Sequence, residues 1–251
     1  MMNVEVTKES EEVIVSTNQG ILGCVNGIVF YNYIYPYIFL ILIQLILGAS
    51  FVATVESNAY LIQMLLNLFT SILTLVVAIF IAKPKMLLNS LKLPRLDDFK
   101  TMIYTLIIMM AVTIGYNFLI TALGVDIGSG NENQATIVEY IKNVPVLSFV
   151  TFVLVGPFLE EVTYRYFLFG SLKKFHSTLA IIVSGFIFMA VHGLAGFMQE
   201  DVSIVRELIL LPPYMFSGCI LACAYNKSGN LTTSTGTHMI NNLISFILSA
   251  L

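Results

Sequence analysis

The sequence predicts an all-α membrane protein, a polytopic bundle of about seven transmembrane helices. Its composition is the first observation: 57% of the 251 residues are hydrophobic and only 11% are charged, whereas a soluble domain carries about 25% charged residues. The second observation is that long stretches contain no Asp, Glu, Lys or Arg at all. Each of these stretches holds the roughly 20 apolar residues that cross a bilayer as a helix.

The charge-free stretches place six spans along the chain, separated by short polar segments such as the turn at Glu56, and one hydrophobic stretch that carries charged residues adds a seventh. The predicted spans are Phe30–Val55, Ala59–Ala82, Thr101–Leu123, Val144–Leu172, Leu179–Phe197, Leu208–Tyr225 and Leu231–Leu251. Pro157 interrupts the fourth span, and because proline removes a backbone hydrogen bond we expect that helix to restart there. The Pro212-Pro213 pair is expected to bend or shorten the sixth span.

Four tyrosines crowd the start of the first span. They are Tyr31, Tyr33, Tyr35 and Tyr37. Tyrosines gather where a span meets the membrane–water interface, so we expect them to anchor the helix there. A stripe that faces the substrate is the alternative interpretation.

One helical membrane domain is expected. Residues 1–27 are polar and acidic and predict a flexible cytoplasmic N-terminal segment. Residues 28–251 then form the transmembrane helical domain, with a motif-bearing core at 144–251. The loop Gly124–Asn143 is predicted to be the longest polar connection. The N-terminus lacks the basic region and short apolar stretch of a cleaved signal peptide, so we expect the spans to direct insertion.

The basic residues predict the orientation in the cell membrane. If the loop Lys83–Lys100 is cytoplasmic, alternation of the spans puts Lys173, Lys174 and Lys227 on the same side, and nine of the twelve Lys and Arg face inward. This asymmetry follows the positive-inside rule and predicts a multi-pass protein with a cytoplasmic N-terminus. The net charge of −3 and the lack of a basic stripe argue against a nucleic-acid partner.

Two carboxylates and a guanidinium interrupt the fourth span, in the stretch Gly156–Arg165. Charged groups at membrane depth cost roughly 2.5–3.5 kcal/mol each and usually pair or line a site. Glu161 and Arg165 are four residues apart and share one face of a helix, whereas Glu160 lies about 100° away. We therefore interpret Glu161 and Arg165 as a structural pair, which leaves Glu160 without a local partner.

Polar residues of two further spans lie at a depth similar to that of Glu160. Counted at about 1.5 Å per residue from the predicted cytoplasmic ends, Glu160, His192, His238 and Asn242 fall within one layer of the membrane. His238 and Asn242 are four apart and share a face. A bundle core brings such groups together in helical metal and proton sites. The alternative to a functional role is a structural one. For His192 it is a hydrogen bond to a backbone carbonyl, and for Phe188, one turn earlier, it is packing.

These residues resemble the signature of the CPBP intramembrane protease family, also called the CAAX-protease and bacteriocin-processing or Abi family. Its Glu-Glu-x-x-x-Arg motif matches Glu160 to Arg165, and its Phe-x-x-x-His motif matches Phe188 to His192. Its third motif, His-x-x-x-Asn, matches His238 to Asn242. The three motifs occur in order within Val144–Leu251, whereas the first three spans carry no match. Members often have eight helices, so eight is the alternative to our count of seven.

The resemblance implies an endopeptidase that acts within the membrane. By similarity, Glu160 and His192 would activate a water molecule, while His238 and Asn242 would stabilise the oxyanion. Glu161, Arg165 and Phe188 would support them. Two cofactor readings stay open, because Glu160, His192 and His238 also suit a catalytic zinc; we favour the metal-free glutamate protease.

We expect a peptidase whose substrate is a membrane-associated peptide or membrane-protein segment, linked to bacteriocin processing or self-immunity by the family resemblance. One alternative is a non-enzymatic bacteriocin-immunity or partner-binding protein that keeps the polar core for packing. A third reading is an ion or proton carrier with Glu160 and the histidines as a relay. The sequence lacks the inverted repeat that many transporters show.

Overall fold

The computed structural model describes residues 15–128, 130–198 and 202–251, and every regular element in this part of the chain is a helix. In chain order the elements are α1 Thr17–Cys24, η1 Val25–Ile34, α2 Tyr35–Leu47, η2 Gly48–Ser50, α3 Phe51–Ser57, α4 Ala59–Ala82, α5 Pro84–Ser90, α6 Leu96–Ala122, α7 Glu132–Asn143, α8 Pro145–Ser148, η3 Phe149–Val155, α9 Gly156–Glu160, η4 Glu161–Phe169, α10 Gly170–Leu172, α11 Ser177–Phe197, α12 Ile204–Leu210, α13 Pro212–Ser228 and α14 Leu231–Ala250. Here η1, η3 and η4 are π-helical and η2 is a 3₁₀ turn.

Six helical segments in the described part are long and apolar enough to cross a membrane. They are Thr17–Ser57, Ala59–Ala82, Leu96–Ala122, Pro145–Leu172, Ser177–Leu194 and Ile204–Ser228. They correspond in order to the first six predicted spans. The seventh predicted span is α14, whose 20 residues are long enough to cross but include more polar side chains. The predicted all-α, multi-pass architecture is confirmed.

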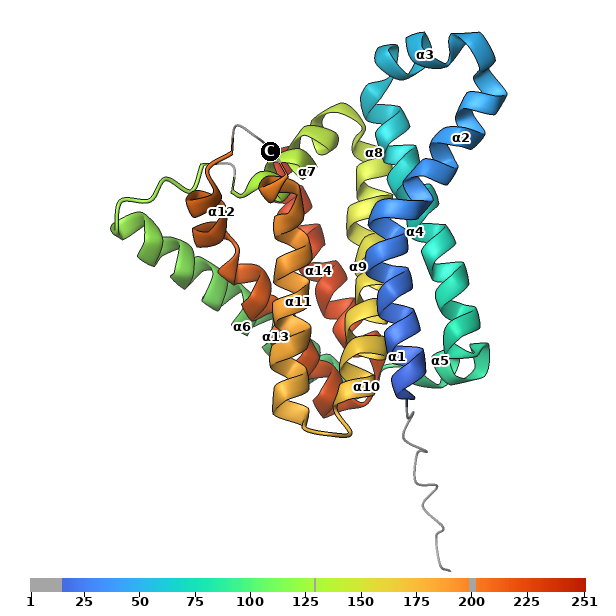
Figure 1. Ribbon diagram of the computed structural model, residues 1–251. Helices are drawn as coiled ribbons and strands as arrows, with labels where there is room; N and C mark the ends of the chain where they lie inside the picture. Colours follow the sequence, from blue (N-terminus) through green and yellow to red (C-terminus); the bar gives the residue numbers. More distant parts are fainter. Residues whose placement is uncertain (1–14, 129, 199–201) are drawn as a thin grey trace, which may run out of the picture.

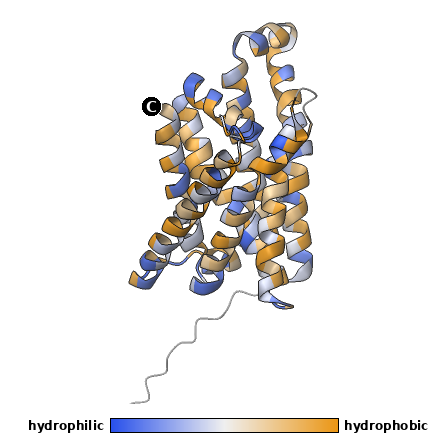
Figure 2. Ribbon diagram, turned by 90° about the vertical axis from the view of Figure 1, so that its left-hand side faces the viewer, coloured by the Kyte–Doolittle hydropathy of each residue, from blue (hydrophilic) through white to orange (hydrophobic). Residues whose placement is uncertain are grey.

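The helices form one bundle in which α1, α4 and α9 stand side by side and α6 runs obliquely along the opposite side (Figure 1). Hydrophobic residues cover the lengths of the helices, and hydrophilic residues gather mainly towards their ends (Figure 2). This distribution is the one expected of spans that cross a bilayer and end at its polar interfaces.

The N-terminal part of the first span differs from the expected flexible segment. Helix α1 begins at Thr17, after Ser16 and Gln19 form a capping box, so residues 17–27 are helical; residues 1–14 of the segment lie outside the described residues. Three glycines on one face explain the close packing of this helix on η4. A Cβ atom at Gly20 would clash with Ser171 of α10, one at Gly23 with Phe167 of η4, and one at Gly27, on the continuation of α1 into η1, with Thr163 of η4. Only glycine avoids such contacts.

The fourth span carries the Glu-Glu-x-x-x-Arg motif on a helix that contains two π-helical stretches. Helix α9 begins at Gly156, next to Pro157, but it continues from η3 without a break, so the expected restart is a local change of winding. The Gly156 amide bonds to Thr151 O, five residues earlier, in the π pattern. Such a wider turn accommodates a proline, which cannot donate a hydrogen bond itself.

The loop predicted between the third and fourth spans contains a helix of its own. Helix α7, residues Glu132–Asn143, starts behind Asn131, whose side chain accepts from Gln134 N. The buried carboxylate of Glu207 accepts a hydrogen bond from Glu132 N at 3.0 Å, so α12 supplies an anion to the positive end of α7. The predicted polar loop Gly124–Asn143 therefore contains a helix over its second half.

Helices α11 and α13 pack closely through small residues, which sets the position of the second motif. A Cβ atom on Gly218 would lie 2.8 Å from the Cα atom of Gly185, so the two backbones approach as in other small-residue interfaces. Cys219 lies at the same contact and is a free thiol, as is Cys223. The sixth span is interrupted at Leu211, where α12 ends and Pro212 starts α13.

Candidate active site

The two motif glutamates face different surroundings. Glu161 is completely buried and its Oε2 atom lies 3.2 Å from Nε of Arg165, which is also completely buried. The side chain of Glu160 keeps 30% of its exposure. The four-residue spacing places Glu161 and Arg165 together on one helical face, and Glu160 points to a separate space between helices.

The guanidinium of Arg165 lies over an aromatic ring of the second motif. Its Cζ atom is 4.9 Å from the ring centroid of Phe188, within the range of a cation–π contact. Phe188 also packs edge-on against Tyr164 and against the imidazole of His238. Phe188 therefore has the packing role given above as the alternative, and it packs against Arg165, Tyr164 and His238.

His238 lies between the two carboxylates. Its Nδ1 atom is 3.0 Å from Glu161 Oε1, and its Nε2 atom is 3.5 Å from Glu160 Oε2. Glu161 is paired with Arg165 and can only accept, so Nδ1 of His238 is the donor in the first contact. A neutral His238 thus turns an unprotonated Nε2 towards Glu160. The sequence reading did not predict the contact between His238 and Glu161.

His192 meets Glu160 from the other side. Its Nε2 atom lies 3.9 Å from Glu160 Oε1, and its Nδ1 atom lies 2.7 Å from the carbonyl oxygen of Phe188. Since a carbonyl only accepts, Nδ1 carries the hydrogen and Nε2 of the neutral ring is an acceptor. His192 therefore makes both the backbone hydrogen bond given above as the structural alternative and the contact with Glu160.

These contacts make an acceptor-rich centre around Glu160. Both carboxylate oxygens face an Nε2 atom, at 3.9 and 3.5 Å, which is longer than an ordinary N–H···O hydrogen bond of about 2.7–3.2 Å. Three groups that accept hydrogen bonds and face one another need a donor among them. A water molecule or a shared proton would serve as this donor. A carboxylate and an imidazole that can hold a water molecule and accept its proton are the groups that general acid–base catalysis needs.

Asn242 is not joined to this centre by a hydrogen bond among the described residues. Its Nδ2 atom donates to Phe152 O at 3.0 Å and its Oδ1 accepts from Asn241 at 3.4 Å. The amide thus ties α14 to η3, one helical turn from His238. Its expected role at the oxyanion uses the second N–H of the same amide.

Tyr214 is a site residue that the sequence reading missed. Its ring stacks on the imidazole of His192, with centroids 4.6 Å apart and an angle of 27° between the planes. Its hydroxyl donates to Asn131 Oδ1 at 3.1 Å and accepts from Asn133 at 3.3 Å, which connects the ring to the start of α7. The only signal in the sequence was a hydroxyl-bearing aromatic residue inside a predicted span.

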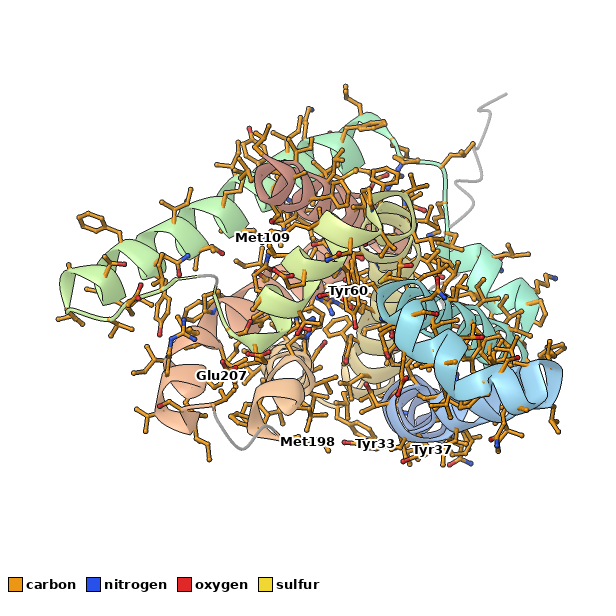
Figure 3. All side chains as sticks on the ribbon, turned by 90° about the horizontal axis from the view of Figure 1, so that it is seen from above. Tyr33, Tyr37, Tyr60, Met109, Met198 and Glu207 are labelled. Carbon is orange, nitrogen blue, oxygen red and sulfur yellow. The ribbon has the colours of Figure 1, made fainter. Side chains whose placement is uncertain are left out.

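The four tyrosines expected at the membrane interface all lie on the first span, and some of them face the second span and the site. Tyr33 and Tyr37 are 43% and 67% exposed and lie at the edge of the bundle seen from above (Figure 3). Tyr35 is buried and donates to Asn26, which binds the Thr74 carbonyl of α4. The Tyr31 hydroxyl lies near Ser71 of α4 and within electrostatic reach of Glu160. The tyrosines therefore divide by helical face: Tyr33 and Tyr37 are exposed, Tyr35 is buried and Tyr31 is half-buried.

The donor groups around Glu160 include the chemical types expected of a zinc site, but not their arrangement. Glu160, His192 and His238 are of the types that bind zinc. In the residues that the structure describes, however, no group of three or more His, Cys, Asp or Glu side chains is arranged to hold a metal ion. The arrangement of these described side chains does not fit a metal centre.

Comparison with known proteins supports the motif assignment. The family model "Rce1-like: Type II CAAX prenyl endopeptidase Rce1-like" matches residues 142–244, a range that contains all three motifs. A curated protein of Bacillus subtilis (strain 168), "Putative membrane peptidase YdiL", is 28% identical over 123 residues, which cover 49% of this chain and 45% of YdiL. The chain thus matches less than half the length of that relative. No solved structure matches. The resemblance to the CPBP family is confirmed by these matches.

Proposed function

We propose that the chain, whose residues 142–244 match the Rce1-like CAAX prenyl endopeptidase model, is an intramembrane endopeptidase of the glutamate type. The observation that carries the proposal is the position of Glu160 between two imidazoles, with Nε2 of His238 at 3.5 Å and Nε2 of His192 at 3.9 Å. Three helices, α9, α14 and α11, supply these side chains.

In the first step, Glu160 acts as the general base. A water held between the Glu160 carboxylate and Nε2 of His192 donates both its hydrogens to acceptors, which leaves an oxygen lone pair directed at the scissile carbonyl. As that oxygen bonds to the carbonyl carbon, Glu160 takes the proton, and it returns the proton to the amine when the C–N bond breaks. Positioned acid–base groups of this kind contribute about 10²–10⁴-fold.

His238 is suited to stabilise the oxyanion. When protonated, its Nε2–H donates to the negative oxygen that forms, while Nδ1–H remains on the Glu161 carboxylate at 3.0 Å. Glu161 fixes the ring orientation and stabilises the imidazolium, as the carboxylate partner of a catalytic histidine does. Asn242 is proposed to add its free amide N–H. Donors aimed at an oxyanion contribute about 3–4 kcal/mol where water is scarce.

The proposed substrate is a peptide or membrane-protein segment that enters from the bilayer. Glu160 and the histidines lie on segments that are apolar enough to cross a membrane or pack among them, so the scissile bond must reach membrane depth. The family resemblance favours a substrate linked to bacteriocin processing or self-immunity. We also propose the orientation given by the basic loops, with the N-terminus in the cytoplasm.

The test compares peptides released from membranes that contain the wild-type protein, the Glu160→Gln variant or no protein, using mass spectrometry. We expect peptides that depend on the wild-type protein, and a loss of at least about 10²-fold in the variant with unchanged membrane insertion. Glu139→Gln is the matched control, because Glu139 is an exposed carboxylate on α7. Full activity of Glu160→Gln would refute the proposed base. An unchanged peptide profile for all samples would favour the non-enzymatic alternative.

A further inference from the structure

A basic pocket lies at the end of the bundle where the chain enters α6 and turns from α13 into α14. Its cavity of about 470 Å³ is lined by four cationic side chains, Lys92, Arg95, Lys173 and Lys227, and by one carboxylate, Asp98. These cations come from three separate parts of the sequence. The fold therefore brings these positive charges together at one cavity, although they lie on separate loops of the chain.

Buried polar groups fix the walls of the basic pocket. Asn230 is 2% exposed; its Oδ1 accepts from Lys92 N at 3.1 Å, and its Nδ2 donates to Lys92 O at 3.2 Å. This double hydrogen bond holds the loop before α6 against the start of α14. The side chain of Lys92 takes no part in it and is available to the cavity.

The carboxylate in the basic pocket is already engaged. Asp98 is 3% exposed; its Oδ2 accepts from Arg95 N at 2.8 Å and lies 3.6 Å from Arg95 Nε, while its Oδ1 accepts from Thr233 at 3.4 Å. Both oxygens therefore face the protein. The side chains of Lys92 and Lys227 also line the cavity, and their positive charge calls for an anionic ligand.

Exposed apolar side chains beside the cations indicate where that anion comes from. Leu93 lines the same cavity and is 93% exposed, and Leu96 and Phe99 on the first turn of α6 are 72% and 50% exposed. The pocket also lies at the ends of the apolar segments Leu96–Ala122 and Ile204–Ser228. Cations beside exposed apolar groups at a span end suit a lipid, whose headgroup is charged and whose chains are apolar.

We propose that the basic pocket binds the phosphate group of an anionic phospholipid, whose acyl chains lie along the exposed apolar face of α6. The ammonium groups of Lys92 and Lys227 neutralise the headgroup, and Leu93 contacts the glycerol end of the chains. Because the pocket joins α6, α13 and α14, the bound lipid connects three helices at this end of the bundle and stabilises them.

Binding is measured by native mass spectrometry and thermal unfolding of the detergent-purified full chain, with phosphatidylglycerol, phosphatidylcholine or inorganic phosphate added. We expect tighter binding and a higher melting temperature with phosphatidylglycerol than with phosphatidylcholine. The double variant Lys92→Gln/Lys227→Gln removes two cations, each contributing about 1 kcal/mol near an anionic surface, so phosphatidylglycerol binding is expected to weaken about tenfold or more.

Lys83→Gln/Lys85→Gln is the matched control, because both lysines are exposed in the preceding basic segment but do not line the cavity. We expect the control to bind phosphatidylglycerol within about twofold of wild type. Equal losses in the two variants, or no preference for phosphatidylglycerol over phosphatidylcholine, would overturn the proposal. Inorganic phosphate that binds as tightly as the lipid would overturn the lipid as the source of the anion. If the double variant fails to fold, Lys227→Gln alone is compared with Lys83→Gln by the same criteria.

Discussion

The Nδ1 atom of His238 lies 3.0 Å from Oε1 of Glu161, a fully buried carboxylate whose other oxygen is 3.2 Å from Nε of Arg165. The two adjacent glutamates therefore do different work. Glu161 joins η4 to α14 through its contacts with Arg165 and with the imidazole of His238, and Glu160 faces Nε2 of both His192 and His238. Consecutive residues on a helix point about 100° apart, which is how one dipeptide serves both purposes.

The first prediction concerns the buried pair. Glu161→Gln leaves Arg165 as a buried, uncompensated charge and should destabilise the fold by about 3–5 kcal/mol, measured by denaturant unfolding of the purified protein in detergent. Glu139→Gln is the control. It breaks the exposed Glu139–Lys142 pair, whose N–O distance is 3.0 Å, and should cost less than about 1 kcal/mol.

A double variant separates stability from chemistry at the same site. Glu161→Leu/Arg165→Leu removes both charges, so we expect it to recover much of the stability lost in Glu161→Gln. It should nevertheless lack peptidase activity, because Nδ1 of His238 has lost its carboxylate. An active double variant would contradict the role given to Glu161, and a stable Glu161→Gln would contradict the buried pair.

The second prediction concerns Tyr214, which positions His192 by stacking at 4.6 Å. Tyr214→Phe keeps the ring but loses the hydrogen bonds to α7, so we expect a stability loss of about 1 kcal/mol with little change in kcat. Tyr214→Leu removes the stack, and we expect kcat to fall about tenfold as the imidazole loses its fixed orientation. The measurement is kcat and KM on a peptide identified from the released set. Equal effects of the two variants on kcat would assign the role to the hydroxyl instead.

The hydrophobic pattern was sufficient for the spans because lipid accepts only long apolar helices in this class of fold. Helix α4, residues Ala59–Ala82, has the predicted bounds. The pattern did not indicate the helix over residues 17–27, because the polar and acidic composition of residues 1–27 suggested flexibility. The effect of a glycine there depends on a partner: Gly23 becomes a packing residue only when Phe167 lies opposite. Helix α7 was missed for a similar reason, because the carboxylate that accepts the hydrogen bond from its first amide belongs to Glu207, 75 residues later.

The composition of the site was easier to predict than its connections. Spacing along a helix pairs Glu161 with Arg165, and equal depth suggests that Glu160, His192 and His238 meet. The contact of Glu161 with His238, and the stacking of Tyr214 on His192, depend on how α14 and α13 rotate about their axes. Helical periodicity does not determine that rotation relative to a distant helix. Asn242 shows the limit, because its depth is compatible with the site while its amide binds Phe152.

The third prediction concerns metal dependence. The donor side chains around Glu160 are not arranged to hold a metal ion among the described residues, so a chelator should leave activity essentially unchanged. The measurement is the rate of peptide release after dialysis against a strong chelator, together with the metal content of the protein. Activity that is lost on chelation and restored by zinc alone would contradict the glutamate mechanism and support the zinc reading.

The fourth prediction tests the glycine face of α1. A Cβ atom on Gly23 would lie 2.1 Å from Cγ of Phe167, and Phe167 is completely buried, so neither side can move aside easily. We expect Gly23→Ala to destabilise the protein by about 1–3 kcal/mol through overpacking, measured by thermal unfolding in detergent. Gly115→Ala is the matched control on α6: no atom lies within 4 Å of its Cβ position, and alanine favours a helix interior by about 0.5–1 kcal/mol over glycine. It should be neutral or stabilising. If the melting temperature of Gly23→Ala equals that of Gly115→Ala, then α1 does not pack on η4 through this face. Residues 17–27 would then be free to move, as the sequence had suggested.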